Sequence, residues 1–384
     1  MIDFELTEDQ IALRDMAHDF AAKEMRPKAA LYDQGHAFPE EVMRKAFEVG
    51  FLTCTVPAEY GGVGLGDLDT AIVSEELAWG CAGMYTTMMA NSLAFTPILL
   101  FGTDEQKKRF LAPFLEKPAF ASYCLTEREA GSDTSAIRTT ARKDGGDYVI
   151  NGSKCFITNG GVSSLYVVFA NAAPEKGARG LSVFVVPRGA PGLSVGKVED
   201  KFGHRASNTT ELFFEDVRVP AANMLGREGL GFVAAMRTFD KTRAAVGAAG
   251  VGVARAALEH AVEYAKTRVQ FGKPIATFQA TAFKLAQMAM DVEAARLVVW
   301  RAAWLMDRGK PNGKESAMAK CLGSDAAMRN ALEALQIFGG YGYMRDYPVE
   351  KLVRDAKLLQ IYEGTNEIQR LVISRDVVGP IRSR

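Results

Sequence analysis

The residue pattern of this chain changes from helical to strand-like near Ala121 and back to helical near Gly226. These two changes limit the folds that the chain can adopt. Between them lie short β-branched and aromatic stretches, separated by turn residues at 144–146 and 159–161. The pattern predicts a run of antiparallel strands forming a small barrel or sandwich. No helical pattern interleaves with these stretches, which disfavours a doubly wound parallel sheet. The strands are expected at 148–150, 155–158, 165–169, 181–186 and 211–214.

Helical patterns flank this segment on both sides. Thr7 and Gln10 fit a capping box, and Thr103 and Gln106 repeat it. Pro27 is expected to end the first helix or to lie just past its end, and Pro39 to begin the second helix in its first turn. Bundle-length helices are expected at 239–266, 278–308 and 316–338, the second with a buried stripe of Leu285, Met288, Val292, Ala295 and Val299.

The predicted fold class is therefore α+β. It comprises an N-terminal helical domain (1–120), a middle antiparallel β-barrel-like domain (121–226) and a C-terminal helical bundle (227–384).

The charge balance and the hydropathy of the chain limit the classes of partner that it can bind. The 46 basic residues balance the 46 acidic ones, which disfavours a nucleic acid or an anionic membrane as partner. Residues 77–103 carry no charge, so a membrane span is one interpretation. Thr86, Asn91 and Pro97 interrupt that segment and no basic anchors flank it, so we predict a buried helix pair lining a core or pocket instead.

Cysteine and histidine usage points to a reducing compartment and to no metal. The five cysteines are scattered without a CxxC pair, and no two of the four histidines have metal-ligand spacing. The first residues are acidic and lack the apolar core of a signal peptide. We expect a cytoplasmic protein, or one of the mitochondrial matrix if this is a processed eukaryotic chain.

The segment 336–370 holds the best candidate for chemistry. A glycine cluster at 339–342 ends one helix, Pro348 precedes the next, and Glu363 then stands between Tyr362 and Gly364. Glycine lets another molecule approach the backbone closely, and a carboxylate held there can act as a base. The alternative is that Gly364 caps a helix and Glu363 is solvated.

Several motifs together resemble the acyl-CoA dehydrogenase family, closest to its short- and medium-chain members. The resemblance runs from about Leu6 to the C-terminus. The strings that carry it are YCLTEREAGSD (123–133), INGSKCFITNGG (150–161), FDKTR (239–243), RVQFGKPI (268–275), QIFGGYGY (336–343) and IYEGT (361–365). Each string alone is weak, but six in the expected order are specific.

The resemblance implies an N-terminal α-domain, a middle β-domain and a C-terminal four-helix bundle, assembled as a homotetramer (a dimer of dimers). Such a protein would bind FAD and oxidise an acyl-CoA thioester to the trans-2-enoyl-CoA, as in β-oxidation. Electrons would pass to an electron-transfer flavoprotein.

For catalysis the resemblance implies that Glu363 removes the α-proton of the thioester while the β-hydrogen leaves as hydride to the flavin. The backbone N–H of Glu363 and a flavin hydroxyl would stabilise the developing oxyanion. Tyr362 would help to exclude water, which raises the pKa of the base, and Gly364 would let the thioester lie close to the backbone.

The remaining site residues follow from the same resemblance. Other interpretations are β-propensity for Thr126 and Thr158, and helix-end charges for Arg268 and Asp240. The implied flavin contacts on the β-domain are Tyr123, Leu125, Thr126, Ser132, Phe156 and Thr158. The implied contacts with the adenine and phosphate half, partly to a neighbouring subunit, are Arg268, Gln270, Phe271, Phe278, Gln279, Gln336, Gly339, Gly340, Thr365 and Glu367. The implied substrate contacts are Ser132, Asp240, Thr242, Arg243, Tyr362 and Gly364.

Two positions depart from the common family pattern. Arg128 and Glu129 replace a Pro-Gly pair, either as a surface ion pair or with Arg128 meeting a polar or acidic acyl tail. Phe156 replaces a tryptophan but keeps an aromatic ring for the flavin. The length, branching and terminal charge of the acyl group are left open, although Phe95 in the uncharged segment could shorten the pocket.

Two rival functions remain open at this point. An enzyme of the same fold could pass electrons to oxygen, as acyl-CoA oxidases do, although such chains carry an extra C-terminal domain. A flavin-free helical interaction protein is the second, which the presence of Thr158, Arg268 and Glu363 disfavours.

Overall fold

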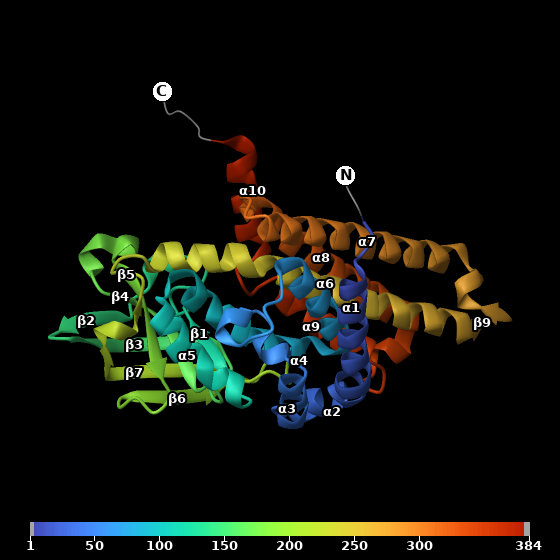
Figure 1. The fold of residues 1–384 in the computed structure, drawn as a ribbon. Coiled ribbons are helices and arrows are strands. Elements are labelled where there is room, and N and C mark those ends of the chain that lie inside the picture. Colours follow the sequence, from blue (N-terminus) through green and yellow to red (C-terminus); the bar gives the residue numbers. More distant parts are fainter. Residues whose placement is uncertain (1–3, 380–384) are drawn as a thin grey trace.

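The computed structural model describes residues 4–379, in which a β-rich unit is inserted between two helical ones (Figure 1). This confirms the predicted α+β class. The long helices of the C-terminal part run beside the N-terminal helices. The strands of the middle unit gather at one end of the molecule, and the short strand β9 (Val269–Gln270) lies at the opposite end.

The N-terminal helices begin as their caps predict. Thr7 and Thr103 each complete a capping box, with Gln10 and Gln106. Pro27 does not end the first helix, because a π turn (Ala21–Met25) and a 3-10 turn (Arg26–Lys28) carry the chain on into α2. Pro39 is the N-cap of α3 and not a first-turn residue. The helices are α1 (Glu8–Phe20), α2 (Ala29–Gly35), α3 (Glu40–Glu48), α4 (Asp67–Phe101) and α5 (Asp104–Glu116).

The uncharged segment lies in α4, most of which is buried. Cys81 has extended backbone angles (φ −167°, ψ 114°) that split α4 into two helices. The predicted burial is therefore confirmed, but after this break the segment continues as one helix and not as a pair. None of the helices among residues 4–379 has the length and apolarity needed to cross a membrane. Phe95 packs against Phe114 at 4.9 Å between ring centroids, in the core between α4 and α5.

The middle unit is one sheet with the order β6-β7-β3-β2-β4-β5-β8, and β1 also pairs with β4. The expected strands at 148–150 and 155–158 are one long strand, β3, with irregular register near Gly152 and Cys155. The prediction of a wholly antiparallel sheet is wrong at β4, which pairs parallel with β1 and β2. The chain between β1 and β4 is long enough for the crossover that a parallel pair needs.

The strands are β1 (Ala121–Cys124), β2 (Thr140–Asp144), β3 (Asp147–Thr158), β4 (Leu165–Asn171), β5 (Leu181–Pro187), β6 (Leu193–Val198), β7 (Thr209–Pro220), β8 (Met224–Leu225), β9 (Val269–Gln270) and β10 (Lys273–Pro274).

The C-terminal bundle is built on α6 (Gly231–Thr267), which begins eight residues earlier than the expected 239. A Cβ at Gly250 would lie 2.4 Å from the Gly323 backbone, and one at Gly252 would lie 2.1 Å from the Glu75 carbonyl. Glycine therefore lets α6 approach α8 and α4 closely. The other helices are α7 (Gln279–Asp307), α8 (Gly313–Phe338), α9 (Val349–Leu359) and α10 (Asn366–Val378).

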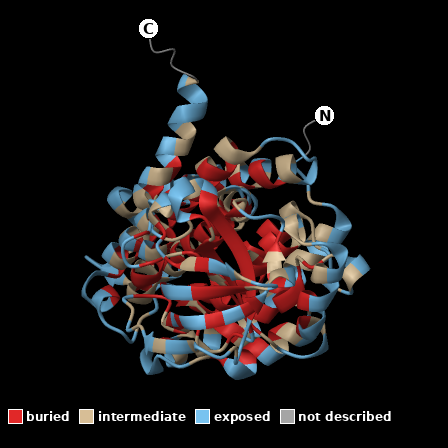
Figure 2. Cartoon of the chain, turned by 90° about the vertical axis from the view of Figure 1, so that its left-hand side faces the viewer, coloured by how far each residue is buried: buried red, intermediate tan, exposed pale blue. Residues whose placement is uncertain are grey.

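Burial follows the predicted stripes. Met288, Val292, Ala295 and Val299 of α7 are buried, and buried residues fill the centre of the molecule while the outer half of α10 is exposed (Figure 2).

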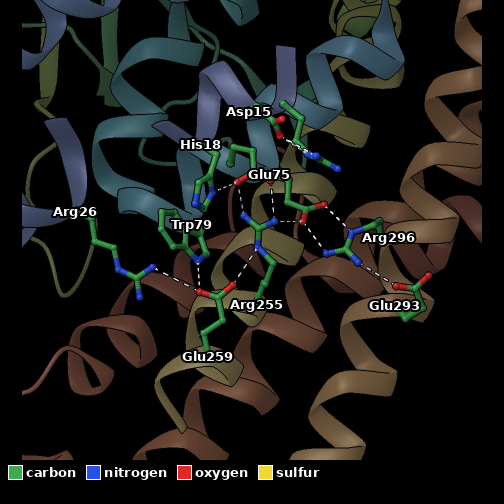
Figure 3. Close-up of polar contacts among 11 residues, drawn as sticks. Asp15, His18, Arg26, Glu75, Trp79, Arg255, Glu259, Glu293 and Arg296 are labelled. Atoms are coloured by element: carbon green, nitrogen blue, oxygen red, sulfur yellow. Dashed lines mark hydrogen bonds and ion pairs between the residues drawn. The ribbon is translucent and has the colours of Figure 1, made fainter. Parts of the chain in front are cut away.

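A buried ion network joins the N-terminal helices to the bundle (Figure 3). Glu75 and Glu76 of α4 are 6% and 2% exposed. Arg255 of α6 donates to Glu76 at 2.7 Å, and Arg296 of α7 donates to Glu75 at 2.7 Å. Burial alone would raise the pKa of Glu76, but the hydrogen bonds and charge of Arg255 outweigh it and lower that pKa. The network therefore fixes α4, and with it one wall of the site described below.

Arg255→Met should lower the free energy of unfolding by about 3–5 kcal/mol, because it leaves the buried Glu76 carboxylate without its main partner. The exposed pair Lys23–Asp19 gives the matched control. Lys23→Met should cost at most about 1 kcal/mol. Urea unfolding curves of the two variants measure this difference. Equal midpoints would show that the network does not stabilise the fold.

Candidate active site

The candidate base lies in a short loop between α9 and α10. Glu363 has φ +52° and Gly364 has φ +90°, both in the left-handed region. For glutamate this conformation costs on the order of 1–3 kcal/mol. The loop is closed at its ends by the Asn366 N–H, which donates to the Gln360 carbonyl at 3.0 Å.

Asp325 of α8 holds both ends of this loop. One carboxylate oxygen accepts from the Gln360 amide at 2.7 Å and from the Asn366 amide at 2.8 Å. The ammonium of Lys320, which is fully buried, donates to Asn366 Oδ1 at 2.8 Å. These contacts fix the loop on the surface of α8.

The backbone carbonyl of Glu363 has two side-chain donors. Gln369 Nε2 donates to it at 3.2 Å and to the Gly364 carbonyl at 2.9 Å, and Arg243 Nε donates to it at 3.5 Å. A Cβ at position 364 would lie 2.6 Å from that same Gln369 nitrogen. Glycine is therefore required at 364 both for its φ angle and for this close contact.

The carboxylate of Glu363 faces α6, and the residue is half-buried. Thr242 Oγ1 donates to Glu363 Oε2 at 2.5 Å. Burial raises the pKa of Glu363 above its ordinary value, while the Thr242 hydrogen bond and the charges of Arg243 and Lys320 act in the opposite direction. The net result is a carboxylate that holds a proton more readily than an exposed one.

Aromatic and charged side chains surround this carboxylate. Arg243 is 4% exposed, and its NH1 donates to Asp240 at 3.3 Å. The ring of Phe239 lies between Arg243 and Tyr123, with 5.4 Å from the Arg243 guanidinium carbon to its centroid and 5.8 Å between the two ring centroids. The Tyr123 hydroxyl is buried and has no hydrogen-bond partner among residues 4–379. Burial and the Glu363 charge both raise its pKa.

A buried ion pair shapes the loop that follows β1. Lys154 is 1% exposed, and its ammonium donates to Glu127 at 2.8 Å and to the Leu125 carbonyl at 2.9 Å. Glu127 also accepts from the backbone N–H groups of Arg138 and Thr139. The loop carrying Thr126 and Ser132 is thereby tied to β3.

Three hydroxyls beside this loop are open to a ligand. Thr126, Ser132 and Thr158 make no side-chain hydrogen bond within the part of the chain that the structure describes. Phe156 has φ +56° and is 66% exposed, so it presents its ring outward from β3. Arg128 and Glu129 are both exposed and form no ion pair with each other in the described residues, so the surface-pair interpretation is wrong.

A second group of predicted residues lies around the β9–β10 hairpin. A hollow of about 510 Å³ is lined by Arg268, Gln270, Gly339 and Gly340 among others. A Cβ on either glycine would meet no atom within 4 Å. Phe271, at the tip of the hairpin, is 94% exposed.

The predicted residues thus fall into separate groups. Near Glu363 the structure brings together Tyr123, Asp240, Thr242, Arg243, Tyr362 and Gly364, with Leu125, Thr126, Ser132, Phe156 and Thr158 on the adjoining β-domain. Around the hairpin lie Arg268, Gln270, Phe271, Phe278, Gln279, Gln336, Gly339 and Gly340. Thr365 and Glu367 belong to the first turn of α10, and Thr365 caps that helix.

Asp325, Lys320 and Gln369 were missed from the sequence. The signal that could have revealed them is a set of polar residues at helical spacing inside the alanine-rich α8 and on the first turns of α10. No group of three or more His, Cys, Asp or Glu in residues 4–379 is arranged to hold a metal ion.

Comparison with known proteins identifies the family. Models of the N-terminal, middle and C-terminal domains of acyl-CoA dehydrogenases match residues 7–117, 122–217 and 229–378. An acyl-CoA dehydrogenase of Bacillus subtilis is 47% identical over 375 residues, which is 97% of this chain and 99% of that protein. The chain belongs to the acyl-CoA dehydrogenase family.

Solved structures agree with this assignment. The butyryl-CoA dehydrogenase of Megasphaera elsdenii superposes with a TM-score of 0.96 and 45% identity, over 98% of this chain and all of that chain. A chain from a structure described as the electron transferring flavoprotein of Acidaminococcus fermentans gives 0.96 and 47%, over 99% and 100%. The acyl-CoA dehydrogenase fold predicted from the motifs is thereby confirmed.

Thr242→Val should raise the pKa of Glu363 further, because the hydroxyl that it removes stabilises the carboxylate. The protonated carboxyl should then persist to higher pH than in the unsubstituted protein. Infrared difference spectra against Glu363→Gln follow its C=O stretch during a pH titration. Thr242→Ser, which keeps the hydroxyl, is the control. If the pKa of Glu363 is the same in Thr242→Val and in Thr242→Ser, the Thr242 hydroxyl does not stabilise the carboxylate.

Proposed function

We propose that the protein is an FAD-dependent acyl-CoA dehydrogenase that converts an acyl-CoA thioester to the trans-2-enoyl-CoA, with Glu363 as the base. The observation that carries the proposal is the Glu363 carboxylate, half-buried, with a raised pKa, on a loop held by α6, α8 and α10. In the reaction the α-C–H bond breaks and its proton goes to Glu363. The electron pair of the α-C–H bond forms the C=C bond, and the β-hydrogen leaves as hydride, for which bound FAD would be the acceptor.

The environment of Glu363 suits a weakly acidic α-proton. A base works best when its pKa approaches the operating pH, and desolvation moves Glu363 in that direction. The charges of Arg243 and Lys320 act in the opposite direction and favour the ionised form of Glu363. The Thr242 hydrogen bond orients the carboxylate, and Tyr362 with α4 limits the access of water to it.

The backbone N–H of Glu363 supports a second role for the same residue. It makes no hydrogen bond to any other group in residues 4–379, unlike the carbonyl of the same residue. A free N–H next to the base can donate to the thioester oxygen as negative charge develops there. Gly364, with no side chain, leaves the backbone open to that approach.

The residues present fit FAD as the cofactor. The unpaired hydroxyls of Thr126, Ser132 and Thr158 and the outward ring of Phe156 would hold the flavin half. Arg268, Gln270 and the open glycines at 339 and 340 would hold the phosphate and adenine half. When bound, FAD supplies a hydride acceptor for the β-hydrogen.

We infer that the adenine half is completed by a neighbouring subunit in a homotetramer, a dimer of dimers. Phe271 and, on α7, Phe283, Met290 and Trp304 are exposed apolar side chains. The outer part of α10 projects from the body of the chain (Figures 1 and 2). Surfaces of this kind are expected at subunit interfaces. A sedimentation mass equal to one chain would contradict the inference.

Glu363→Gln should bind acyl-CoA and remain yellow, because the amide keeps the size of the side chain but cannot take a proton. Its flavin should bleach about 10²–10⁴ times more slowly than the unsubstituted enzyme, the usual contribution of a general base. Anaerobic stopped-flow mixing with acyl-CoAs of different length, branching and terminal charge measures the rate and the substrate class together. A bleaching rate close to that of the unsubstituted enzyme would assign the base elsewhere.

We further propose that an electron-transfer flavoprotein, and not oxygen, takes the electrons. The reduced enzyme with bound product should be reoxidised by an added electron-transfer flavoprotein at least about 100 times faster than by air-saturated buffer. Stopped-flow absorbance of the flavin compares the two acceptors directly. If air reoxidises the enzyme as fast, the oxidase alternative is the correct one.

A further inference from the structure

A fully buried amide holds the backbone of the candidate base from the side of α10. Gln369 lies in the first turn of that helix and is 0% exposed. Its Nε2 donates to the Glu363 carbonyl at 3.2 Å and to the Gly364 carbonyl at 2.9 Å. One side-chain nitrogen therefore satisfies two consecutive backbone acceptors of the loop.

The two carbonyls fix the orientation of this amide. A carbonyl oxygen can only accept a hydrogen bond, so the nitrogen and not the oxygen of Gln369 must face the loop. The amide oxygen is buried and has no hydrogen-bond partner among residues 4–379. Such an orphaned acceptor costs about 1–3 kcal/mol. The side chain thus holds the loop at a cost to its own oxygen, which is a pattern typical of functional sites.

The two hydrogen bonds depend on the left-handed backbone of the loop. Glu363 and Gly364 have φ +52° and +90°. If the chain continued α9 as a right-handed helix, each carbonyl would point along the helix axis toward the N–H four residues later. In the left-handed conformation both carbonyl oxygens lie within 3.2 Å of one nitrogen atom. The bonds from Gln369 therefore favour this conformation over a continued helix.

Gln369 is the main donor to the Glu363 carbonyl. The other donor, Arg243 Nε, lies 3.5 Å away, at the outer limit of a hydrogen bond. Burial raises the pKa of Glu363 and the charge of Arg243 acts against it, whereas the amide of Gln369 is neutral. A neutral donor holds the backbone of the base without making the carboxylate less basic.

Gly364 and Gln369 fit each other closely. A Cβ at position 364 would lie 2.6 Å from Gln369 Nε2, which is closer than two such atoms can approach. A side chain at 364 would therefore push the amide away from the two carbonyls. The hydrogen bonds of Gln369 and the glycine at 364 depend on each other.

The carboxylate end of the same glutamate is held from another helix. Thr242 Oγ1 of α6 donates to Glu363 Oε2 at 2.5 Å. We propose that Gln369 is a positioning residue for proton transfer, which holds Glu363 in the left-handed conformation that directs its carboxylate toward α6. The proposal rests on the function proposed above for Glu363. A base misplaced by 1 Å can slow a reaction about 100-fold.

Two substitutions of similar length test the donor. Gln369→Met keeps the length of the side chain but has no N–H group, and an ionised Gln369→Glu can only accept. With butyryl-CoA as the probe, both should slow anaerobic flavin bleaching about 10–100 times. Gln34→Glu, at an exposed position of α2, is the matched control and should leave the rate unchanged. Bleaching of the Met variant at the unsubstituted rate would overturn the proposal.

Substrate binding separates positioning from a general loss of structure. The dissociation constant of butyryl-CoA should change less than about threefold in both variants, because the loss lies in the transition state. Melting temperature and flavin content are recorded for each variant. A loss of binding as large as the loss of rate would overturn the proposal. If Gln369→Met does not fold, Gln369→Glu, which differs from glutamine in one atom, decides the same question.

A double-mutant cycle tests the fit with Gly364. Gly364→Ala should slow bleaching, because its Cβ displaces the Gln369 amide and its φ angle is strained. In a Gln369→Ala background the amide is already gone, so Gly364→Ala should slow bleaching less there than in the unsubstituted protein. Equal slowing in both backgrounds would show that the two residues act independently, and the proposal would fail.

A readout without catalysis follows the base itself. Infrared difference spectra of each variant, with and without Glu363→Gln, give the pKa of Glu363. In Gln369→Met the released loop lets water reach the carboxylate, so this pKa should fall toward its ordinary value. Gln34→Glu should leave it unchanged. A pKa that Gln369→Met does not alter would overturn the proposal. If the unsubstituted enzyme does not bleach at all, the proposed function fails, while this measurement still decides whether Gln369 holds Glu363.

Discussion

The site depends on one constraint, a six-residue loop between α9 and α10 that holds a glutamate in a left-handed backbone conformation. Glu363 at φ +52° costs about 1–3 kcal/mol. Hydrogen bonds from Arg243 and Gln369 to its carbonyl, and from the loop ends to Asp325, contribute about 0.5–1.5 kcal/mol each. Together these bonds are comparable with the strain or larger, so contacts with the surrounding helices can hold the conformation. The backbone conformation thereby directs the Glu363 side chain toward Thr242 on α6. It does not point along the direction that a continued α9 helix would give it.

The helices that hold this loop are themselves fixed by close backbone contacts and buried charge. Gly250 and Gly252 let α6 lie close against α8 and α4. This close packing fixes the position of Thr242 and Arg243 on α6 relative to the loop. Arg255 and Arg296 then tie α4 to α6 and α7. Thr86 of α4 lies 3.0 Å from a ring nitrogen of His204, which follows β6. The same helix therefore connects the bundle to the β-domain. A rigid frame of this kind is what a base needs if it is to meet one particular C–H bond.

Local patterns predicted the elements but not the contacts between distant ones. The capping boxes at Thr7 and Thr103 depend on residues within one turn, and both appear as expected. The stripe on α7 depends on helical spacing alone, and four of its five residues are buried while Leu285 is half-buried. The parallel pairing of β4 with β1 depends on the path of the whole domain and carries no local signal. In the site, Glu363 stood out because glycine follows it. Asp325 accepts a hydrogen bond from a residue 35 positions away, and the His204 N–H donates to one 151 positions away. Only the fold reveals such contacts.

The balance of charge around Glu363 explains how one carboxylate can be both buried and basic. Burial alone raises its pKa, and a carboxyl that keeps its proton cannot take another one. Full pairing with an arginine would make it too weak a base. Here Arg243 donates to Asp240 as well as to the Glu363 backbone, so its charge reaches the carboxylate only in part. Burial also lowers the pKa of Lys320 to about 8, and the charge of Arg243 acts in the same direction. Two cations held slightly off the carboxylate thus offset its burial without neutralising it.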